Sequence, residues 1–253
     1  MELNYLAIVQ ARFNSTRLPG KVLLEVFGKS FLEHQIARIK LAKKIDKIVI
    51  ATSTEKSDEK IYELGKSIGV DVFRGSLENV LDRFFHATNL FPSKNIIRLT
   101  ADCPLIDWEK IDELIEFFEE GNFDYASNAL EPTLPDGLDA EVFKSSVLKK
   151  TWREASLNSE KEHVTPYIHS HPEMFSIGKK KYYEDHSDLR WTLDEPEDLE
   201  LITKIYEHFY PMNCYFGYED ILNFLETRPD LKSINLKIKR NEGFEKSLMN
   251  DNK

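Results

Sequence analysis

The stretch AIVQARFNSTRLPGK, residues 7–21, decides the class of fold, because an apolar run passes directly into a basic loop. Residues 6–9 predict a buried strand, and Arg12, Arg17 and Lys21 follow it. Ligands of parallel α/β sheets bind at the carboxyl ends of the strands, so cations placed there are expected to bind an anion. The loop lacks the glycine spacing of a dinucleotide-binding or Walker motif, and its side-chain cations suit a triphosphate or pyrophosphate. The alternative is a solvated basic turn in which Arg17 pairs with a surface acid.

Apolar and amphipathic segments alternate through the first half of the chain. Further strands are predicted at residues 47–51, at residues 70–75 and from residue 95, and helices at residues 31–41, 57–69 and 76–88. Ser57 is the expected N-cap of the second helix, and Gly69 its end. Strands that alternate with helices predict a parallel, doubly wound sheet, so we expect a Rossmann-like, three-layer α/β/α fold.

The pattern changes after about residue 121, which indicates a smaller α+β region inserted into the main fold. Strands and turns are predicted at residues 124–143, helices at 145–155 and 159–171, sheet-like alternation at 179–194 and an amphipathic helix at 195–210. We expect a single domain over residues 1–240, in which residues 126–190 are the insertion and residues 191–240 return to the core. Residues 241–253 are predicted to be a polar tail, frayed from about Lys237 onward.

The composition argues against several classes of protein. The formal net charge is −10 over 253 residues, so the overall field does not attract nucleic acid. No long apolar run opens the chain, which predicts neither a signal peptide nor a membrane span. Cys103 and Cys214 form no metal-type cluster, and the spacing of His163, His169 and His171 does not suit zinc. We therefore expect a cytoplasmic protein that binds neither nucleic acid nor membranes.

Two aspartates are candidate metal ligands. Asp102 follows the strand that starts at residue 95, and Asp194 in RWTLDEPEDL precedes a helix. Hard cations such as Mg²⁺ prefer carboxylate oxygens beside phosphates, so both side chains could hold one ion. Each aspartate also has a structural alternative. Asp102 could form an Asx turn or cap the helix that begins near Asp107, and Asp194 could cap the helix that follows it.

Five blocks of the sequence resemble the cytidylyltransferases that make CMP-sugar acids, the acylneuraminate and 3-deoxy-manno-octulosonate synthetases. The blocks are ARFNSTRLPGKVL, RLTADCPLI, PDGLDAEVF, EHVTPYI and RWTLDEPEDL, and they occur in the family's order over residues 4–210. The resemblance is strongest to the spore-coat polysaccharide type. It implies a GT-A-like nucleotidyltransferase fold, with residues 1–125 as the CTP-binding half and residues 126–190 as an acceptor and dimerisation insertion.

The resemblance also implies a reaction and roles for particular residues. CMP would pass from CTP to a small acidic sugar with release of pyrophosphate, in a homodimer that serves the synthesis of surface polysaccharides. The implied catalytic residues are Arg12, Lys21, Asp102 and Asp194, of which Asp102 and Asp194 would bind Mg²⁺. The residues implied to bind CTP are Ala11, Arg12, Ser15, Arg17, Lys21, Gly75, Ser76 and Arg98. Related uridylyl- and guanylyltransferases carry a glycine-rich GG loop that this chain lacks, which favours CTP.

The acceptor stays open at the level of sequence, because residues 130–188 match the sialic-acid and octulosonate enzymes poorly. Candidates to line its pocket are Asn128, Asp139, Glu141 and the EHVTPY segment, while Arg190 could pair with the acceptor or with Asp102. One alternative is a cytidylyltransferase for a phosphorylated acceptor. Another is a GT-A-type glycosyltransferase that uses a sugar nucleotide, although a D-x-D pair is missing. The third is a nucleotide-binding scaffold, against which the retained cations and aspartates speak.

Overall fold

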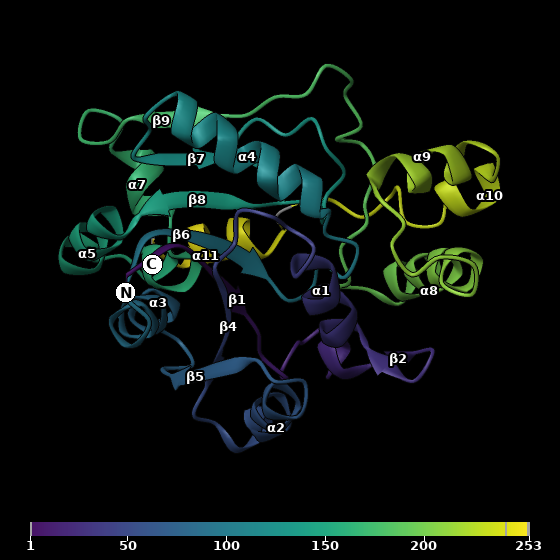
Figure 1. Ribbon diagram of the computed structural model, residues 1–253, viewed down its shortest axis with the longest axis horizontal. Helices are drawn as coiled ribbons and strands as arrows, with labels where there is room; N and C mark the ends of the chain where they lie inside the picture. Colours follow the sequence, from purple (N-terminus) through teal and green to yellow (C-terminus); the bar gives the residue numbers. More distant parts are fainter. Residues whose placement is uncertain (1, 241, 252–253) are drawn as a thin grey trace.

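The computed structural model describes residues 2–240 and 242–251, and within them the centre is a seven-stranded sheet in the order β5-β4-β1-β6-β8-β7-β9 (Figure 1). The strands are β1 (Leu3–Gln10), β4 (Lys47–Ser53), β5 (Asp71–Gly75), β6 (Ser93–Thr100), β7 (Tyr125–Ser127), β8 (Glu141–Lys144) and β9 (Ile177–Lys179). The neighbours β5, β4, β1 and β6 are parallel, and β8 runs antiparallel to both β6 and β7. The mainly parallel α/β sheet predicted from the sequence is confirmed.

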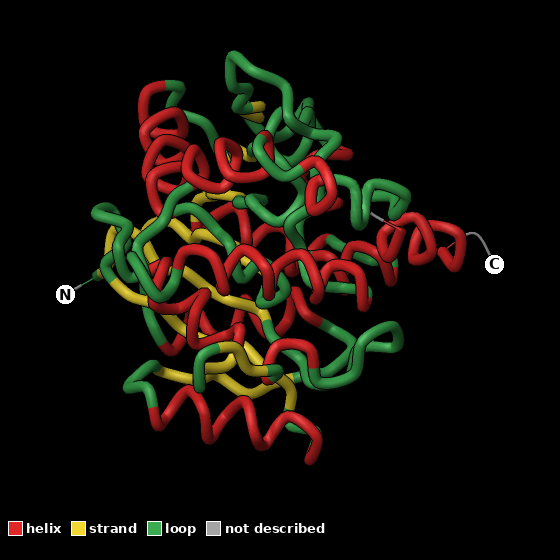
Figure 2. The backbone as a smooth tube through the Cα atoms, turned by 90° about the vertical axis from the view of Figure 1, so that its right-hand side faces the viewer, coloured by secondary structure: helices red, strands yellow, loops and turns green. Residues whose placement is uncertain are grey.

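Helices cover both faces of this sheet. Successive side chains of each buried strand point to opposite faces, so both faces carry apolar side chains that pack against helices. Ala7 and Val9 of β1 belong to one hydrophobic core, and Leu6 and Ile8 belong to another. The first core includes α1 (Phe31–Ile39), α2 (Glu59–Ser67) and α4 (Trp108–Glu120), and the second includes α3 (Val80–Leu90), α5 (Ser145–Glu154) and α7 (Pro166–Ser170). Figure 2 shows the strands as a layer between these helices. The three-layer arrangement is therefore the expected one.

A further hydrophobic core lies beside the sheet, at the right of Figure 1. It contains α8 (Pro196–Phe209), which was predicted, and α9 (Tyr218–Glu226) and α10 (Pro229–Lys232), which were not. Trp191, Tyr206 and Phe216 are buried in it. The short helix η1 (Lys21–Leu23) and the hairpin of β2 (Glu25–Val26) and β3 (Lys29–Ser30) lead from the basic loop to α1. Within the described residues, every helix is too short or too polar to cross a membrane.

Two local predictions are wrong. Ser57 lies within the short helix η2 (Lys56–Asp58) and does not cap α2, because Asp58 occupies the N-cap position. Residues 179–194 are mostly loop, and their contribution to the sheet is the end of β9 and an isolated bridge between Asp136 and Arg190. The alternation that resembled a strand arises because Leu189, Trp191 and Leu193 point into the core beside the sheet.

The C-terminal segment is helical and does not fray as predicted. After residue 241, which lies outside the described part with residues 252–253, the chain forms α11 (Glu242–Asp251) and packs on α6 (Asn158–His163). Ser247 Oγ is 3.0 Å from His163 Nε2 and donates to Glu162 at 2.7 Å. The Asp251 carboxylate accepts a hydrogen bond from the Ser159 backbone N–H at 3.1 Å. These polar contacts fix the position of α11 on α6, although the sequence of α11 shows no apolar periodicity.

Replacing Gly137 by alanine is expected to destabilise the fold by more than the about 1–3 kcal/mol that a strained positive φ costs by itself, because the new Cβ also clashes with backbone. Gly137 has φ +108°, and a Cβ there would lie 2.5 Å from the Trp191 carbonyl carbon and 2.6 Å from the Thr192 nitrogen. Both atoms belong to backbone, so the segment that leads to Asp194 must shift. Urea unfolding measures the loss. Gly69→Ala is the matched control, because Gly69 also has a positive φ of +67° but open space around a Cβ. Equal losses in the two variants would contradict the steric argument.

Candidate functional site

A cavity of about 470 Å³ opens at the carboxyl ends of β1 and β6. The chain order of the sheet reverses between these strands, since β4 and β5 continue on the far side of β1. Ligands of doubly wound sheets bind at this switch point. The predicted site residues that line the cavity are Ala11, Arg12, Ser15, Arg17, Lys21, Arg98, Asp102 and Asp194. Segments far apart in the sequence therefore meet where the loop after β1 was expected to bind an anion.

Lys21 joins the two predicted metal ligands. Its Nζ donates to Asp102 Oδ2 at 2.8 Å and to Asp194 Oδ1 at 2.6 Å. Burial lowers the pKa of Lys21, but the charges of the two carboxylates outweigh that effect and raise it. Burial raises the pKa of Asp102, but the charge and hydrogen bond of Lys21 outweigh that effect and hold it well below its usual range. Lys21 is thus cationic and Asp102 anionic at neutral pH.

The two arginines of the basic loop differ in their contacts. Arg17 pairs with Asp194 at 2.9 Å and with Glu195 at 3.2 Å. The Arg12 side chain is exposed and makes no hydrogen bond or ion pair in residues 2–240 and 242–251. Arg12 is therefore available to an anionic ligand, whereas Arg17 is already held beside Asp194. The structural alternative for Arg17 was pairing with a surface acid. Arg17 does pair with a carboxylate, that of Asp194, but this carboxylate lines the cavity.

The Asp102 and Asp194 carboxylates fit a divalent cation such as Mg²⁺. Both converge on a single positive charge, the Lys21 ammonium, which shows that their oxygens can share one cation. The described residues hold no group of three or more His, Cys, Asp or Glu side chains arranged for a metal. Mg²⁺ is usually held by only one or two carboxylates together with substrate phosphates and water. The donor set therefore suits an ion that arrives with a nucleotide.

Arg190 holds the Asp194 oxygen that does not contact Lys21. The Arg190 guanidinium donates to Asp198 at 3.0 Å, to Asp136 at 2.7 Å and to Asp194 Oδ2 at 3.1 Å. Asp198 is fully buried and also accepts the backbone N–H of Asp194 at 2.9 Å. The helix-cap role that was the structural alternative for Asp194 belongs to Glu195, the N-cap of α8. Asp194 is therefore held in place by its neighbours, and its Oδ1 faces Lys21.

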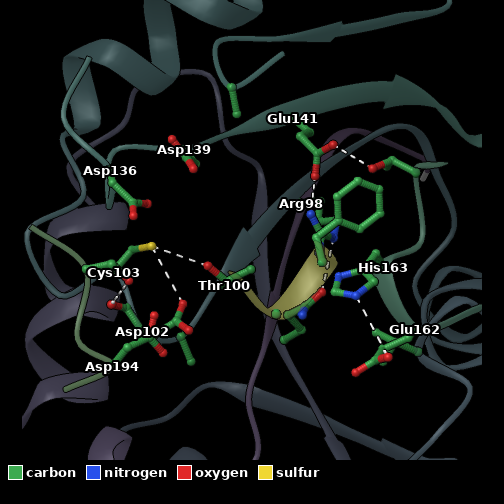
Figure 3. A pocket seen from close by; sticks show the side chains of 18 of the residues that line it. Arg98, Thr100, Asp102, Cys103, Asp136, Asp139, Glu141, Glu162, His163 and Asp194 are labelled. Atoms are coloured by element: carbon green, nitrogen blue, oxygen red, sulfur yellow. Dashed lines mark hydrogen bonds and ion pairs between the residues drawn. The ribbon is translucent and has the colours of Figure 1, made fainter. Parts of the chain in front are cut away.

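The opposite side of the cavity is organised around Glu141, as Figure 3 shows. Glu141 pairs with Arg98 and accepts hydrogen bonds from Tyr125 at 2.5 Å and Thr165 at 2.7 Å. Burial raises the pKa of Glu141, but the charge of Arg98 and these hydrogen bonds hold it below its usual range. Val164, between α6 and α7, has φ +72°, a strained value for a β-branched residue. This strained junction places Thr165 and His163 in the cavity wall.

Asp136 and Asp139 form an acidic wall between these two sides (Figure 3). Burial and the neighbouring carboxylates raise the pKa of Asp139 to about 7, although Arg240 opposes the shift. Arg240 pairs with Asp139 and also donates to the Leu134 carbonyl at 3.2 Å. Arg240 was missed at the sequence level, because it lies in the segment predicted to fray. Nothing in its local pattern indicates a partner a hundred residues earlier.

Gly75, Ser76 and Asn128, which were predicted individually, lie outside the cavity lining, as do Val164 and Tyr167 of the EHVTPY segment. Ser76 accepts the backbone N–H of Asn79 at 3.0 Å, and Gly75 ends β5. Asn128 donates to the Leu138 carbonyl and accepts from the Ala140 N–H, both at 2.8 Å, which is the packing role left open from sequence. Arg83, whose side chain lies against Gly75, does line the cavity and was missed. The sequence did carry a sign of this residue: Arg83 is a cation three positions after Val80, on the predicted buried face of α3.

Comparisons with known proteins agree with this geometry. The sequence profile of the family described as Cytidylyltransferase matches residues 6–221. The chain is 36% identical over 211 residues to the spore coat polysaccharide biosynthesis protein SpsF of Bacillus subtilis, covering 80% of this chain and 86% of that protein. It is 30% identical over 222 residues to the mitochondrial 3-deoxy-manno-octulosonate cytidylyltransferase of Arabidopsis thaliana, covering 81% and 73%.

The fold agrees as well. The solved structure of a cytidylyltransferase from Leptospira borgpetersenii superposes with a TM-score of 0.85 at 31% sequence identity, covering 92% of this chain and 97% of that one. The family profile spans most of the chain, from β1 to α9, and includes both aspartates and the basic loop. The matches cover 73–97% of the length of these relatives. The chain therefore belongs to the cytidylyltransferase family.

Proposed function

We propose that this protein transfers CMP from CTP to a sugar acid and releases pyrophosphate. A hydroxyl oxygen of the acceptor attacks the α-phosphorus and gives up its proton to solvent, a new O–P bond forms, and the bond between the α-phosphorus and the bridging oxygen breaks, so that pyrophosphate leaves with the electron pair. The observation that carries the proposal is the contact of Lys21 with Asp102 and Asp194 at the switch point of the sheet. Cations and carboxylates at this position suit a metal-bound triphosphate.

The basic loop supplies the positive charge that the leaving pyrophosphate needs. Arg12 is unpaired in the described part of the chain and can bind the outer phosphates, while Lys21 neutralises charge near the α-phosphate. Mg²⁺ held by Asp102 and Asp194 would neutralise phosphate charge and orient the phosphate oxygens. Arg190 and Asp198 keep Asp194 aimed at the same point. Preorganised charges of this kind stabilise a transition state without reorganisation.

The acceptor would occupy the side of Arg98, Glu141 and Thr165. This wall offers the Arg98 guanidinium, which can contact an acceptor carboxylate, and the Glu141 carboxylate and Thr165 hydroxyl, which can contact sugar hydroxyls. Among the relatives, the Arabidopsis thaliana protein is a cytidylyltransferase of the sugar acid 3-deoxy-manno-octulosonate by its description, and SpsF is named for spore coat polysaccharide. The first description supports a sugar-acid acceptor, and the second supports a role in polysaccharide synthesis.

Incubating the protein with CTP and Mg²⁺ tests the proposal. We expect pyrophosphate release, measured by an enzyme-coupled phosphate assay, with at least one sugar acid from a panel of acylneuraminates and octulosonates. A chelator should reduce the rate to background, and added Mg²⁺ should restore it. A phosphorylated acceptor is tested in parallel. Pyrophosphate release with this acceptor alone would favour the alternative cytidylyltransferase, which acts on a phosphorylated acceptor. Transfer from a ready-made sugar nucleotide without pyrophosphate would instead favour a glycosyltransferase. Absence of activity in both assays would favour a nucleotide-binding protein without turnover.

The homodimer and the cytoplasmic location expected from the sequence stay predictions. Light scattering during size-exclusion chromatography measures the first, since the chain mass is 29.5 kDa and a dimer doubles it. Cell fractionation measures the second.

A further inference from the structure

The C-terminal segment of the chain forms one wall of the cavity. Four of its residues belong to the lining, namely Lys239, Glu242, Gly243 and Phe244, and the last three begin α11. The family profile ends at residue 221, so this wall lies beyond the part of the chain that the profile describes. The family match therefore assigns no role to these residues, although they border the site.

The segment is held at two other walls of the cavity. Arg240 pairs with Asp139 in the acidic wall. The Glu242 carboxylate lies 4.0 Å from the Arg17 guanidinium in the basic loop. Both anchors are polar contacts to residues that themselves line the cavity. The beginning of α11 is therefore placed by the site, and a ligand in the cavity meets it directly.

Phe244 brings an aromatic ring to the acceptor side of the cavity. Its ring packs on that of His163 with centroids 5.1 Å apart and planes at 78°. Figure 3 shows His163 on the same side of the cavity as Arg98 and Glu141, and the charges of both residues act on it. An edge-to-face pair uses at most one face of each ring, so His163 leaves at least one face of Phe244 uncovered. Because Phe244 is only partly buried and lines the cavity, that face is available to a ligand.

Gly243 leaves open space beside this ring. A Cβ at Gly243 would meet no heavy atom of the described residues within 4 Å, so a side chain there would enter space that the protein does not fill. Its φ is not positive, so the backbone conformation does not require glycine. Glycine is also the least favourable residue in a helix apart from proline. What glycine provides at this position is therefore room in the cavity wall next to Phe244.

We propose that Gly243 and Phe244 determine which acceptors the site takes, because one face of a sugar ring packs on Phe244 in the space that Gly243 leaves open. The inference rests on the proposed function in that it takes the acceptor to be a sugar acid. The face of an aromatic ring carries partial negative charge. The C–H groups on one face of a sugar ring are polarised positively by the adjoining oxygens and are attracted to it. The wall thus favours acceptors in ring form over acyclic ones.

Acceptor binding without turnover tests this role. Calorimetric titration of an acylneuraminate or an octulosonate into protein saturated with CTP, with a chelator present, gives the acceptor dissociation constant. Phe244→Ala should raise this constant roughly 3–10-fold, and Phe244→Tyr, which keeps the ring, should retain the natural value. Gly243→Trp should raise it by at least about 10-fold, since the indole fills the space that the sugar needs. The dissociation constant of CTP should stay the same in all three variants.

Glu245 and Met249 provide matched controls on the same helix. Both lie on α11 outside the cavity lining, and Met249 is 65% exposed. Met249→Ala removes an apolar side chain as Phe244→Ala does, and Glu245→Trp adds the same bulk as Gly243→Trp. We expect both controls to bind the sugar acid and CTP like the natural protein. Thermal unfolding of Phe244→Ala should show a midpoint lowered by less than about 2 °C, because the ring belongs to none of the hydrophobic cores.

The outcomes separate this inference from the proposed function. Unchanged acceptor affinity in Phe244→Ala and Gly243→Trp overturns the inference even if pyrophosphate is released as proposed. A parallel loss of CTP affinity in these variants would show that α11 supports the site as a whole, and would also overturn it. Sugar-acid binding that depends on Phe244, without any pyrophosphate release, would support the inference and contradict the proposed reaction. A natural protein that neither binds nor turns over any sugar acid of the panel would overturn both.

Discussion

Replacing Asp102 by asparagine is expected to lower the rate of CMP transfer by at least about 10²–10³-fold while the fold stays intact. Asp102 is one of the two carboxylates that contact Lys21, and the amide carries no charge to hold a cation there. Asparagine has nearly the same shape, and Asp194 still pairs with Lys21. Pyrophosphate release at saturating CTP measures the rate, and circular dichroism and thermal unfolding verify the fold.

The control for Asp102→Asn is Asp230→Asn. Asp230 is an exposed aspartate paired with Arg228 at 2.7 Å, so the substitution removes one charge far from the cavity. We expect this variant to retain the rate of the natural protein. If Asp102→Asn released pyrophosphate at a comparable rate, the assignment of Asp102 as a metal ligand and catalytic residue would be wrong.

Replacing Arg190 by methionine is expected to cost about 3–5 kcal/mol of folding stability, the largest loss of any single substitution discussed. Arg190 is 5% exposed and holds Asp136, Asp194 and Asp198 together. Burial lowers the pKa of Arg190, but hydrogen bonds and charges of these carboxylates raise it above its usual value, so the arginine is always cationic. Its removal leaves three close carboxylates without their common cation. Urea unfolding at pH 7.5 measures the loss.

The loss in Arg190→Met should depend on pH. Arg190 lowers the pKa of Asp136, so without it the folded-state pKa rises further above the ordinary aspartate value of about 3.9. A folded state that binds protons more tightly than the unfolded chain gains stability as the pH falls through the folded-state pKa. The deficit relative to the natural protein should therefore shrink between pH 7.5 and pH 5. A constant deficit would contradict the electrostatic explanation.

Arg228→Met is the matched control for Arg190→Met. Its partner Asp230 is 61% exposed at the side chain, and exposed ion pairs contribute less than about 1 kcal/mol. Arg190→Lys should recover only part of the stability, because an ammonium cannot reproduce the fork that reaches three carboxylates. Near-natural stability of Arg190→Met would show that the three carboxylates do not need this cation.

The first half of the fold could be predicted because its signals are local. The apolar run of β1 and the basic loop behind it are adjacent in the sequence, and parallel strands bring their ends to one edge. The convergence of Lys21, Asp102 and Asp194 follows from that rule and is observed. Their chemical roles stay predictions, as do the dimer and the acceptor.

The remainder of the site depends on contacts that no local pattern records. Arg83 lies on an ordinary amphipathic helix, and its place in the cavity wall appears only in the structure. Arg240 finds Asp139 across 101 positions of the chain. The alternation at residues 179–194 was misread because a loop that crosses a core buries every second side chain just as a strand does. Burial alone does not distinguish the two.

The position of the C-terminal segment has an evolutionary consequence. Lys239, Gly243 and Phe244 line the cavity, yet they follow the last element of the hydrophobic cores and belong to none of them. Substitutions there can change the shape and charge of one wall at little cost to folding, whereas the parallel strands and the basic loop are tied to the buried sheet. Divergence of substrate choice among descendants of this chain can therefore proceed through its final residues while the machinery for the nucleotide is inherited intact.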